Sequence, residues 1–166
     1  MNDKEKIFLS ILERHKGIIY KVANTYGYDS AEQEDLIQEI VVQIWLSIAN
    51  FNDQYKWSTW IYRIALNTSI SHYRKNKTRK ERTVQLSPII EIPHVPEAPF
   101  MDERFRLLRQ FIRELKELDR ALMLLYLDGL TSKEMAKVMD ITVSNVTTKI
   151  SRIRKKLKHK FENHKA

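Results

Sequence analysis

The residue types best suited to binding nucleic acid gather in residues 57–82, which read WSTWIYRIALNTSISHYRKNKTRKER. Cations attract the phosphate backbone, aromatic rings offer faces on which unstacked bases stack, and Asn offers a base edge both a donor and an acceptor. Aromatic residues and Asn67 come first, and the cations that follow are Arg74, Lys75, Lys77, Arg79, Lys80 and Arg82. This composition predicts a surface for nucleic acid, single strands included; the alternative is a solvated basic helix without a ligand.

One helix is expected to carry this stretch. Ser58 is its expected N-cap, because the hydroxyl accepts a hydrogen bond from a free backbone N–H one turn later. Apolar residues recur every three or four positions and predict a buried stripe of Trp60, Ile61, Ile64, Ala65 and Thr68. The opposite, exposed face is expected to hold Tyr62, Arg63, Asn67 and His72.

Composition favours an all-α protein of 166 residues, folded as one domain or as two small ones, because only three glycines occur and the apolar residues keep helical spacing. A net charge of +8 favours a polyanionic partner, either nucleic acid or an acidic membrane surface. The absence of cysteine excludes a disulfide framework and a thiolate metal site. The charged N-terminus does not resemble a signal peptide, and no segment is apolar enough to insert in a membrane, so a cytoplasmic location is expected.

Two helices are expected at the N-terminus, over 4–26 and 31–49. Gly17 weakens the middle of the first, so two shorter helices are an alternative there. Ser30 and Gln33 have the spacing of a capping box at the start of the second. The apolar face of the second helix is expected to consist of Leu36, Ile37, Ile40, Val41, Ile44, Trp45 and Ile48.

The second helix lies in an acidic block, since no Lys or Arg occurs between Lys21 and Lys56. Asp35, Gln38 and Glu39 fall on one exposed face by their i, i+3, i+4 spacing. Such a face repels DNA and suits a basic protein surface. An ordinary solvated helix with acids near its N-terminus is an alternative. A metal or acid–base role for Asp35 and Glu39 is disfavoured, because no third ligand or histidine lies near them in sequence.

The loop 51–57, FNDQYKW, combines turn residues with three aromatic rings. The rings either staple the loop to the core or wall a pocket for an extruded base. The first interpretation is favoured for Phe51 and Trp57.

A proline-rich linker is expected at 83–103, since all four prolines (Pro88, Pro93, Pro96 and Pro99) lie there without a helical period. Proline removes backbone donors and fixes φ, so the segment is expected to be extended and semi-rigid. It would separate a domain at 1–82 from a domain at 104–166.

The second domain is expected to contain a helix at 104–117, a helix capped by Asp119 that stops at Gly129, and then a helix-turn-helix. Thr131 and Glu134 have capping-box spacing, and Ala136 is small enough for two helices to cross closely. Val138 and Met139 are expected to face the core, Asp140 and Ile141 to make the turn, and Thr142 to cap the last helix.

The last helix has the pattern of a recognition helix. Its expected buried stripe is Val146, Ile150, Ile153 and Leu157. The residues left exposed are Ser144, Asn145, Thr147, Thr148, Lys149 and Arg152. Short polar side chains in the first turns suit the major groove, and the cations behind them suit phosphate. A helical hairpin with a basic tail and no DNA is the alternative.

These motifs, taken in order, resemble a sigma-70-family sigma factor: DLIQEIVVQIW at 35–45, the loop and WSTWIYRIALN at 51–67, the basic run, and the helix-turn-helix. The two-domain form resembles the extracytoplasmic-function group, over about 14–82 and 104–161. Three positions depart from the family pattern. Ser71 stands where an acid is usual, Asp140 where glycine is common, and Leu118–Asp119 where Leu-Pro is usual; the first leaves the DNA contacts around His72–Arg74 open.

The resemblance implies that 1–82 binds core RNA polymerase and the minus-ten promoter element and that 104–166 binds the minus-thirty-five element. Asp35, Gln38 and Glu39 match the motif that grips the polymerase. The implied minus-ten residues are Tyr55, Trp60, Arg63, Asn67, Arg74 and Lys75, with Asn67 and the 51–57 loop at positions where the family captures a flipped base of the non-template strand. The implied minus-thirty-five residues are Ser144, Asn145, Thr148, Lys149 and Arg152.

The expected function is therefore promoter recognition and melting for transcription initiation, with no cofactor, no metal and no catalytic residue. The family often has an inhibitory anti-sigma partner, although no residue of this sequence shows one. A stand-alone helix-turn-helix regulator that acts without polymerase is the alternative. A nucleic-acid enzyme is disfavoured, because the sequence has no Cys, scattered histidines and no metal-ligand spacing.

Overall fold

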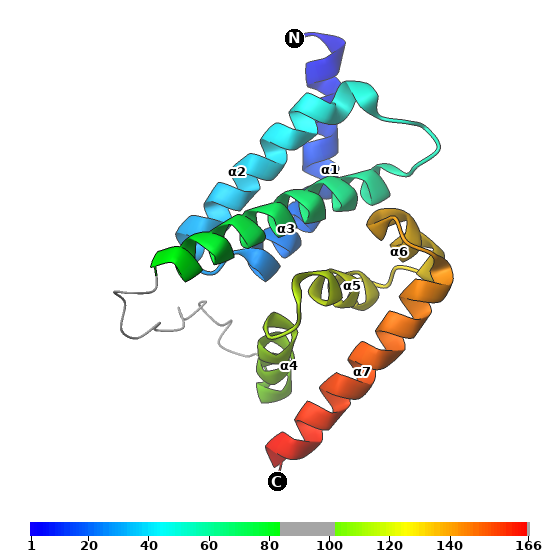
Figure 1. The fold of residues 1–166 in the computed structure, drawn as a ribbon. Helices are drawn as coiled ribbons and strands as arrows, with labels where there is room; N and C mark the ends of the chain where they lie inside the picture. Colours follow the sequence, from blue (N-terminus) through cyan, green and yellow to red (C-terminus); the bar gives the residue numbers. More distant parts are fainter. Residues whose placement is uncertain (84–101, 166) are drawn as a thin grey trace. The chain divides into compact units, whose positions relative to one another are not determined.

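The computed structural model describes residues 1–83 and 102–165, and within these ranges every regular element is a helix (Figure 1). The chain divides into two compact units, Met1–Val95 and Pro96–Ala166. The expected all-α fold is confirmed. Most of the predicted linker, residues 84–101, lies outside the described residues.

The first unit packs three long helices around one core. They are α1 (Asp3–Tyr26), α2 (Ser30–Ser47) and α3 (Trp57–Thr83), with a short 3-10 turn, η1 (Ile48–Asn50), after α2. Each long helix contacts the other two, and α2 and α3 run side by side across α1 (Figure 1). The fully buried side chains at the centre are Val22, Leu36, Ile40, Ile44, Ile61 and Leu66.

α1 is one unbroken helix, so the alternative of two shorter helices at Gly17 is wrong. Glycine inside a helix costs about 1 kcal/mol relative to alanine. Burying Ile11, Ile19 and Val22 on the core side of α1 outweighs that cost, since each large aliphatic side chain contributes roughly 1.5–3 kcal/mol. Asn2 and Glu5 also form a capping box at the start of the helix.

The start of α2 differs from the prediction by one residue. Asp29, not Ser30, is the N-cap, and its carboxylate accepts the N–H of Glu32 at 2.8 Å. Glu32 in turn accepts the N–H of Tyr28 at 2.6 Å. Gln33 instead donates to the carbonyl of Gly27 at 3.3 Å. Asp is at least as good a cap as Ser, which explains the earlier start.

α3 begins at Trp57, so Ser58 is not its N-cap. The first helical hydrogen bond runs from the N–H of Trp60 to the carbonyl of Lys56 at 3.1 Å. The predicted C-terminal extent of this helix is confirmed, because α3 continues through the basic run to Thr83.

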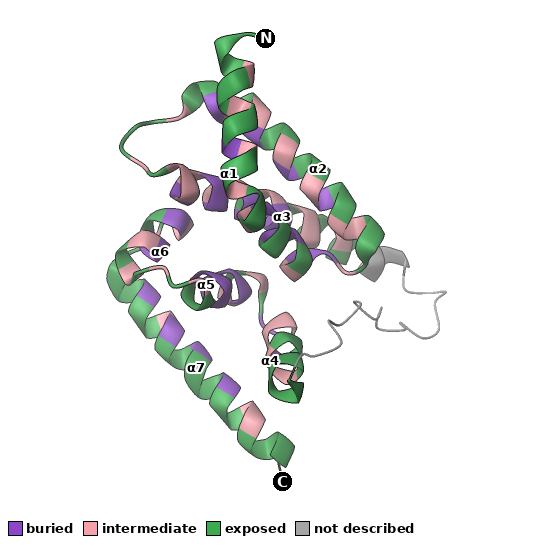
Figure 2. Cartoon of the chain, turned by 180° about the vertical axis from the view of Figure 1, so that it is seen from behind, coloured by how far each residue is buried: buried purple, intermediate pink, exposed green. Residues whose placement is uncertain are grey.

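The buried face of α3 is also turned relative to the prediction (Figure 2). Its buried side chains from the third residue on are Thr59, Ile61, Tyr62, Ala65, Leu66, Ser69 and Ile70. Tyr62, predicted to be exposed, is only 5% exposed, whereas Trp60, Ile64 and Thr68 are half-buried. The reason is that α3 packs against both α1 and α2. Two neighbouring helices bury a wider part of the α3 circumference than the single apolar stripe that the spacing predicted.

The second unit consists of α4 (Glu103–Arg113), α5 (Glu117–Leu127), α6 (Ser132–Met139) and α7 (Val143–Lys165). α7 contacts each of the other three. Its buried stripe of Val146, Ile150, Ile153 and Leu157 is as predicted (Figure 2). At its far end Lys160 pairs with Glu114, and the ring of Phe161 meets Phe111 edge-on at 4.9 Å.

The predicted helix 104–117 is wrong at its C-terminus, because α4 ends at Arg113 and α5 begins at Glu117. Lys116 occupies the N-cap position, and Asp119 lies in the first turn of α5 rather than at the cap. Buried Arg120 explains the break: its guanidinium donates to the carbonyls of Arg113 at 2.6 Å and Leu115 at 3.2 Å. Those carbonyls would otherwise lack partners at the helix end.

None of the helices in the described ranges is both long and apolar enough to cross a membrane.

Candidate nucleic-acid and protein interfaces

Three aromatic rings pack together where the 51–57 loop joins α3. Phe51 and Trp57 stack with ring centroids 3.5 Å apart and planes 10° apart. Trp60 meets both rings edge-on, at 5.6 Å from Phe51 and 5.4 Å from Trp57. All three remain half-buried, so the rings staple the loop to α3, as favoured for Phe51 and Trp57, while part of each ring faces solvent.

Tyr55 and Arg63 continue this surface. Arg63 lies over the ring of Tyr55, with the guanidinium carbon 5.6 Å from the ring centroid. The loop holds Tyr55 in place because its N–H donates to the carbonyl of Asn52 at 3.1 Å, and the Asn52 side chain accepts the N–H of Gln54 at 3.1 Å. Such Asx turns fix a loop by local hydrogen bonds.

Asn67 lies one turn beyond Arg63 on the same side of α3. Its side chain is exposed, and it makes no hydrogen bond with another described residue. The amide thus keeps both its donor and its acceptor for a base edge. Arg74, two turns further along the helix, and Lys75 are exposed as well. The structure therefore gathers the predicted minus-ten residues along one solvent-facing side of α3 and the loop before it.

The basic end of α3 is attached to the start of α2. The Asn76 side-chain amide donates to the carboxylate of Glu32 at 2.6 Å, and it lies 3.4 Å from the Nδ1 of His72. The rings of Tyr26 and Tyr73 meet edge-on at 6.3 Å nearby. Neither Glu32 nor Asn76 was singled out as a site residue from sequence, and 44 positions separate them.

α2 presents the predicted acidic face. Asp35, Gln38 and Glu39 are exposed, while Leu36 and Ile40 beside them are fully buried and hold the helix in place. None of the three polar side chains makes an ion pair or hydrogen bond with another described residue. The carboxylates of Asp35 and Glu39 therefore face solvent without an ion-pair partner among the described residues.

An apolar surface continues this face along α2. Val42 is 51% exposed and Leu46 is 61% exposed. Neither was predicted as a site residue from the sequence. The available signal was that both are apolar and yet lie outside the predicted buried stripe of this helix.

The helix-turn-helix of the second unit follows the predicted local chemistry. Thr131 and Glu134 form the capping box, with hydrogen bonds of 2.8 and 3.2 Å between each side chain and the other residue's N–H. Asp140 has the left-handed conformation, with φ 54° and ψ 48°, and the N–H of Ile141 closes the turn on the carbonyl of Ala136 at 3.1 Å. Thr142 accepts the N–H of Asn145 at 3.1 Å and so caps α7 as predicted.

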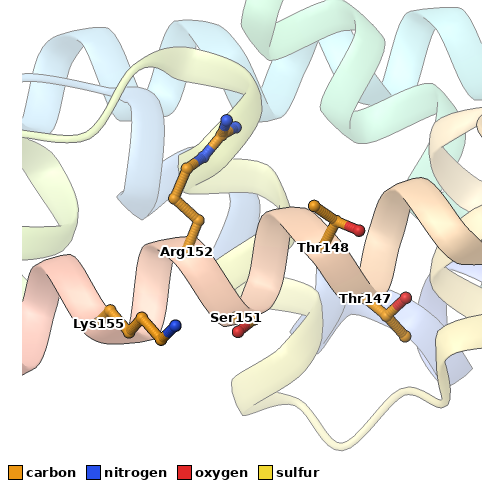
Figure 3. A pocket seen from close by; sticks show the side chains of 5 residues that line it. All are labelled: Thr147, Thr148, Ser151, Arg152 and Lys155. Atoms are coloured by element: carbon orange, nitrogen blue, oxygen red, sulfur yellow. The ribbon is translucent and has the colours of Figure 1, made fainter.

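The solvent-facing side of α7 contains the predicted minus-thirty-five residues. Ser144, Asn145, Thr148 and Arg152 are exposed, and Lys149 is half-buried. A surface hollow lies along this side, lined by Thr147, Thr148, Ser151, Arg152 and Lys155. Figure 3 shows Thr148 and Arg152 projecting on one side of the helix and Ser151 and Lys155 on the other. Ser151 and Lys155 were not predicted as site residues.

One predicted exposed group is partly engaged by its own helix. The Thr147 hydroxyl donates to the carbonyls of Val143 at 3.2 Å and Ser144 at 2.9 Å. Thr147 therefore offers a ligand acceptor lone pairs and a methyl group. Within the described ranges no cluster of three or more His, Cys, Asp or Glu side chains is arranged to hold a metal ion.

Two family models match this chain, one in each unit. The model of sigma-70 region 2 matches residues 11–79, and that of sigma-70 region 4 matches residues 105–157. The first match includes the acidic face of α2 and α3 as far as Arg79, and the second includes α6, the turn and α7 as far as Leu157.

Three relatives are similar over most of their length. The chain is 29% identical to the ECF RNA polymerase sigma factor SigW of Bacillus subtilis, over 94% of this chain and 89% of the relative. It is 32% identical to the RNA polymerase sigma factor SigZ of the same species, over 81% and 75%. It is 25% identical to the ECF RNA polymerase sigma-E factor of Escherichia coli, over 95% and 88%.

Solved structures show the same fold at lower identity. RpoE in complex with the anti-sigma factor NepR from Bartonella quintana has a TM-score of 0.75 and 17% identity, over 98% of each chain. CnrH in complex with the cytosolic domain of CnrY has a TM-score of 0.68 and 19% identity, over 96% of this chain and 90% of CnrH. With both regional models matched in order and a relative at 32% identity, the chain belongs to the sigma-70 family of RNA polymerase sigma factors, in the extracytoplasmic-function group.

Proposed function

We propose that three surfaces of this sigma factor bind three different ligands. α2 binds core RNA polymerase, and α3 with the loop before it binds the melted minus-ten element. α7 binds the minus-thirty-five element as duplex DNA. Family membership gives the general activity, since sigma factors bind core RNA polymerase and recognise promoter DNA. The assignment to individual residues is the proposal.

The observation that carries the proposal is that the exposed face of α2 is acidic, whereas the exposed faces of α3 and α7 are basic. Asp35, Gln38 and Glu39 project from α2 in a chain whose net charge is +8. A phosphate backbone would be repelled by this face, whereas a cationic protein surface would be attracted to it. Exposed Val42 and Leu46 add apolar area beside the acids, as a protein contact requires.

The surface of α3 suits a single strand better than a duplex. Tyr55 and Trp60 supply aromatic faces, and Asn67 supplies an amide for a base edge. Arg63, Arg74 and Lys75 supply charge for the adjacent phosphates. Trapping one unstacked base in this way offsets the cost of unpairing it, on the order of a few kcal/mol. Promoter melting is therefore driven by binding energy.

α7 suits the major groove. Its first turns expose Ser144, Asn145 and Thr148, which are short enough for base edges to be approached closely. Lys149 and Arg152 follow one and two turns later and meet the phosphates. The protein acts by binding alone, without chemistry of its own, and works where the polymerase is, in the cytoplasm.

An anti-sigma protein is a further proposed partner. The structure of RpoE contains the anti-sigma factor NepR, and this likeness of fold supports the same kind of partner here. A protein that copurifies with the tagged chain in a one-to-one complex, and that core polymerase displaces, would support it. A chain that is always isolated alone or with polymerase would argue against it.

A stand-alone helix-turn-helix regulator is the competing function, and size-exclusion chromatography separates the two. The proposal requires that the purified chain elute as a small protein alone and shift into the polymerase peak when core enzyme is added. A chain that binds duplex DNA as a dimer and never enters the polymerase peak would support the competing function.

A further inference from the structure

The last turns of α3 have almost no core to hold them. Up to Arg79, the last residue of α3 whose burial is described, Ile70 is the last buried side chain, and between Ser71 and Arg79 every side chain is exposed or half-buried. The predicted DNA-binding residues Arg74 and Lys75 lie in this segment. Apart from the edge-on contact of Tyr73 with Tyr26, packing does little to fix their direction.

The hydrogen bond between Asn76 and Glu32 supplies a fixed attachment for this segment. The Asn76 amide donates to one carboxylate oxygen of Glu32 at 2.6 Å, and the other oxygen accepts the N–H of Tyr28 at 2.6 Å. The N–H of Glu32 itself is bound by Asp29 at 2.8 Å. Because both carboxylate oxygens and the backbone N–H of Glu32 are hydrogen-bonded, the carboxylate is held in place at the first turn of α2.

We propose that Glu32 is a positioning residue for promoter DNA: through Asn76 it fixes the basic end of α3, and with it Arg74 and Lys75, relative to the helix that docks on polymerase. The inference rests on the proposed function of α3. Glu32 lies one turn before Asp35 on α2, so this hydrogen bond joins the docking helix to the basic end of the DNA-binding helix. Glu32 touches no DNA itself in this role.

Charge and position predict opposite effects for the same substitution. Glu32→Gln raises the net charge by one unit, and simple attraction to phosphate would then tighten DNA binding. It also replaces the charge-assisted bond from Asn76 with at most a neutral amide–amide bond, for which the Asn76 amide must turn over and give up its contact with His72, so the attachment is weakened. The positioning role predicts weaker DNA binding, by about tenfold, which is near the lower limit of what a charge-assisted hydrogen bond contributes.

Exchanging the carboxylate and the amide between positions 32 and 76 restores the hydrogen bond. In Glu32→Gln with Asn76→Asp, the Gln oxygen accepts the Tyr28 N–H and its amide donates to the new carboxylate, while the net charge returns to its original value. Asn76→Asp alone places two carboxylates together and breaks the bond. Glu34→Gln is the matched control, because Glu34 is an exposed acid of α2 that makes no hydrogen bond or ion pair with another described residue through its side chain.

The experiment measures affinity of the assembled holoenzyme for a fluorescent fork-junction DNA with a single-stranded minus-ten region, taken from a promoter that the wild type transcribes. We expect each single variant to lose about tenfold in affinity with core binding unchanged, the double variant to recover to within about threefold, and Glu34→Gln to match the wild type. Unchanged or tighter binding by Glu32→Gln, or a double variant no better than the weaker single variant, would overturn the proposal.

Hydrogen exchange in the free protein gives a readout that does not require polymerase. The amides of residues 72–79 are expected to exchange faster in Glu32→Gln than in the wild type, and to return to the wild-type rate in the double variant. If the wild-type holoenzyme bound no fork DNA, the proposed function would fail. The exchange result would still decide separately whether Glu32 holds the end of α3, and equal rates in all variants would show that it does not.

Discussion

Arg63 lies over the ring of Tyr55, with its guanidinium carbon 5.6 Å from the ring centroid. This contact joins the loop before α3 to the exposed side of the helix, and Asn67 follows one turn later. A flipped base at this place would meet an aromatic face, a cation and an amide within about one turn of helix. We therefore expect the Tyr55 ring, rather than its hydroxyl, to matter for the melted strand.

Tyr55→Ala is predicted to weaken binding of the holoenzyme to fork-junction DNA, by roughly fivefold to a hundredfold, because a stacked base contributes about 1–3 kcal/mol. Tyr55→Phe is the matched control, since it keeps the ring and the contact with Arg63, and should bind like the wild type. Fluorescence anisotropy with fork DNA and with fully duplex DNA measures both. Equal losses on the two DNAs would argue against base capture.

The double variant Asp35→Ala, Glu39→Ala is predicted to bind core RNA polymerase at least about tenfold more weakly, because interface charge pairs are lost. Its fold should persist, since both side chains are exposed and Leu36 and Ile40 beneath them are untouched. Asp3→Ala with Glu13→Ala removes the same charge from exposed positions of α1 and serves as the control. Wild-type polymerase affinity in the α2 variant, measured by biolayer interferometry, would reject the docking face.

Lys149→Ala and Arg152→Ala are each predicted to reduce the slope of log affinity against log salt by about one unit on duplex carrying a minus-thirty-five element, because each releases one counterion fewer. Lys16→Ala removes one cation from α1 and should leave the slope unchanged. Titrations at four or more salt concentrations give the slopes. Parallel lines for all three variants and the wild type would mean that α7 does not meet phosphate at these positions.

The helix-turn-helix was predictable almost to the residue because its determinants are local. The capping box of Thr131, the left-handed turn at Asp140 and the cap at Thr142 each depend on hydrogen bonds that span three to five residues. The residue types at these positions therefore predict those hydrogen bonds from the sequence alone. The exposed acids of α2 were predictable for the same reason, since their spacing alone places them on one face.

Features that depend on tertiary contacts were not predictable. Tyr62 is buried because α3 has two neighbouring helices, and the break after α4 depends on Arg120, which reaches back to the carbonyls of Arg113 and Leu115. The bond between Glu32 and Asn76 spans 44 positions and leaves no periodic signal. The caps at Ser58 and Ser30 were misplaced because several adjacent polar residues compete for each helix start.

Gly17 and Gly27 are predicted to respond in opposite directions to alanine. A Cβ at Gly17 would meet no atom within 4 Å, so Gly17→Ala should stabilise the first unit by about 0.5–1 kcal/mol through helix propensity. A Cβ at Gly27 would lie 2.9 Å from the Cα of Gln33 and the carbonyl of Ala23, so Gly27→Ala should destabilise it. Urea unfolding of both variants tests this, and a destabilised Gly17→Ala would contradict the helix seen here.

Run-off transcription tests the central claim most directly. Core RNA polymerase, the purified chain and a library of promoter fragments are incubated with nucleotides, and the transcripts are sequenced. We expect a defined set of start sites that appears only when the chain is present, that shares two spaced sequence elements, and that Asp35→Ala with Glu39→Ala removes. Transcripts that do not depend on the chain, or none at all from a core enzyme that a known sigma factor activates, would contradict the account.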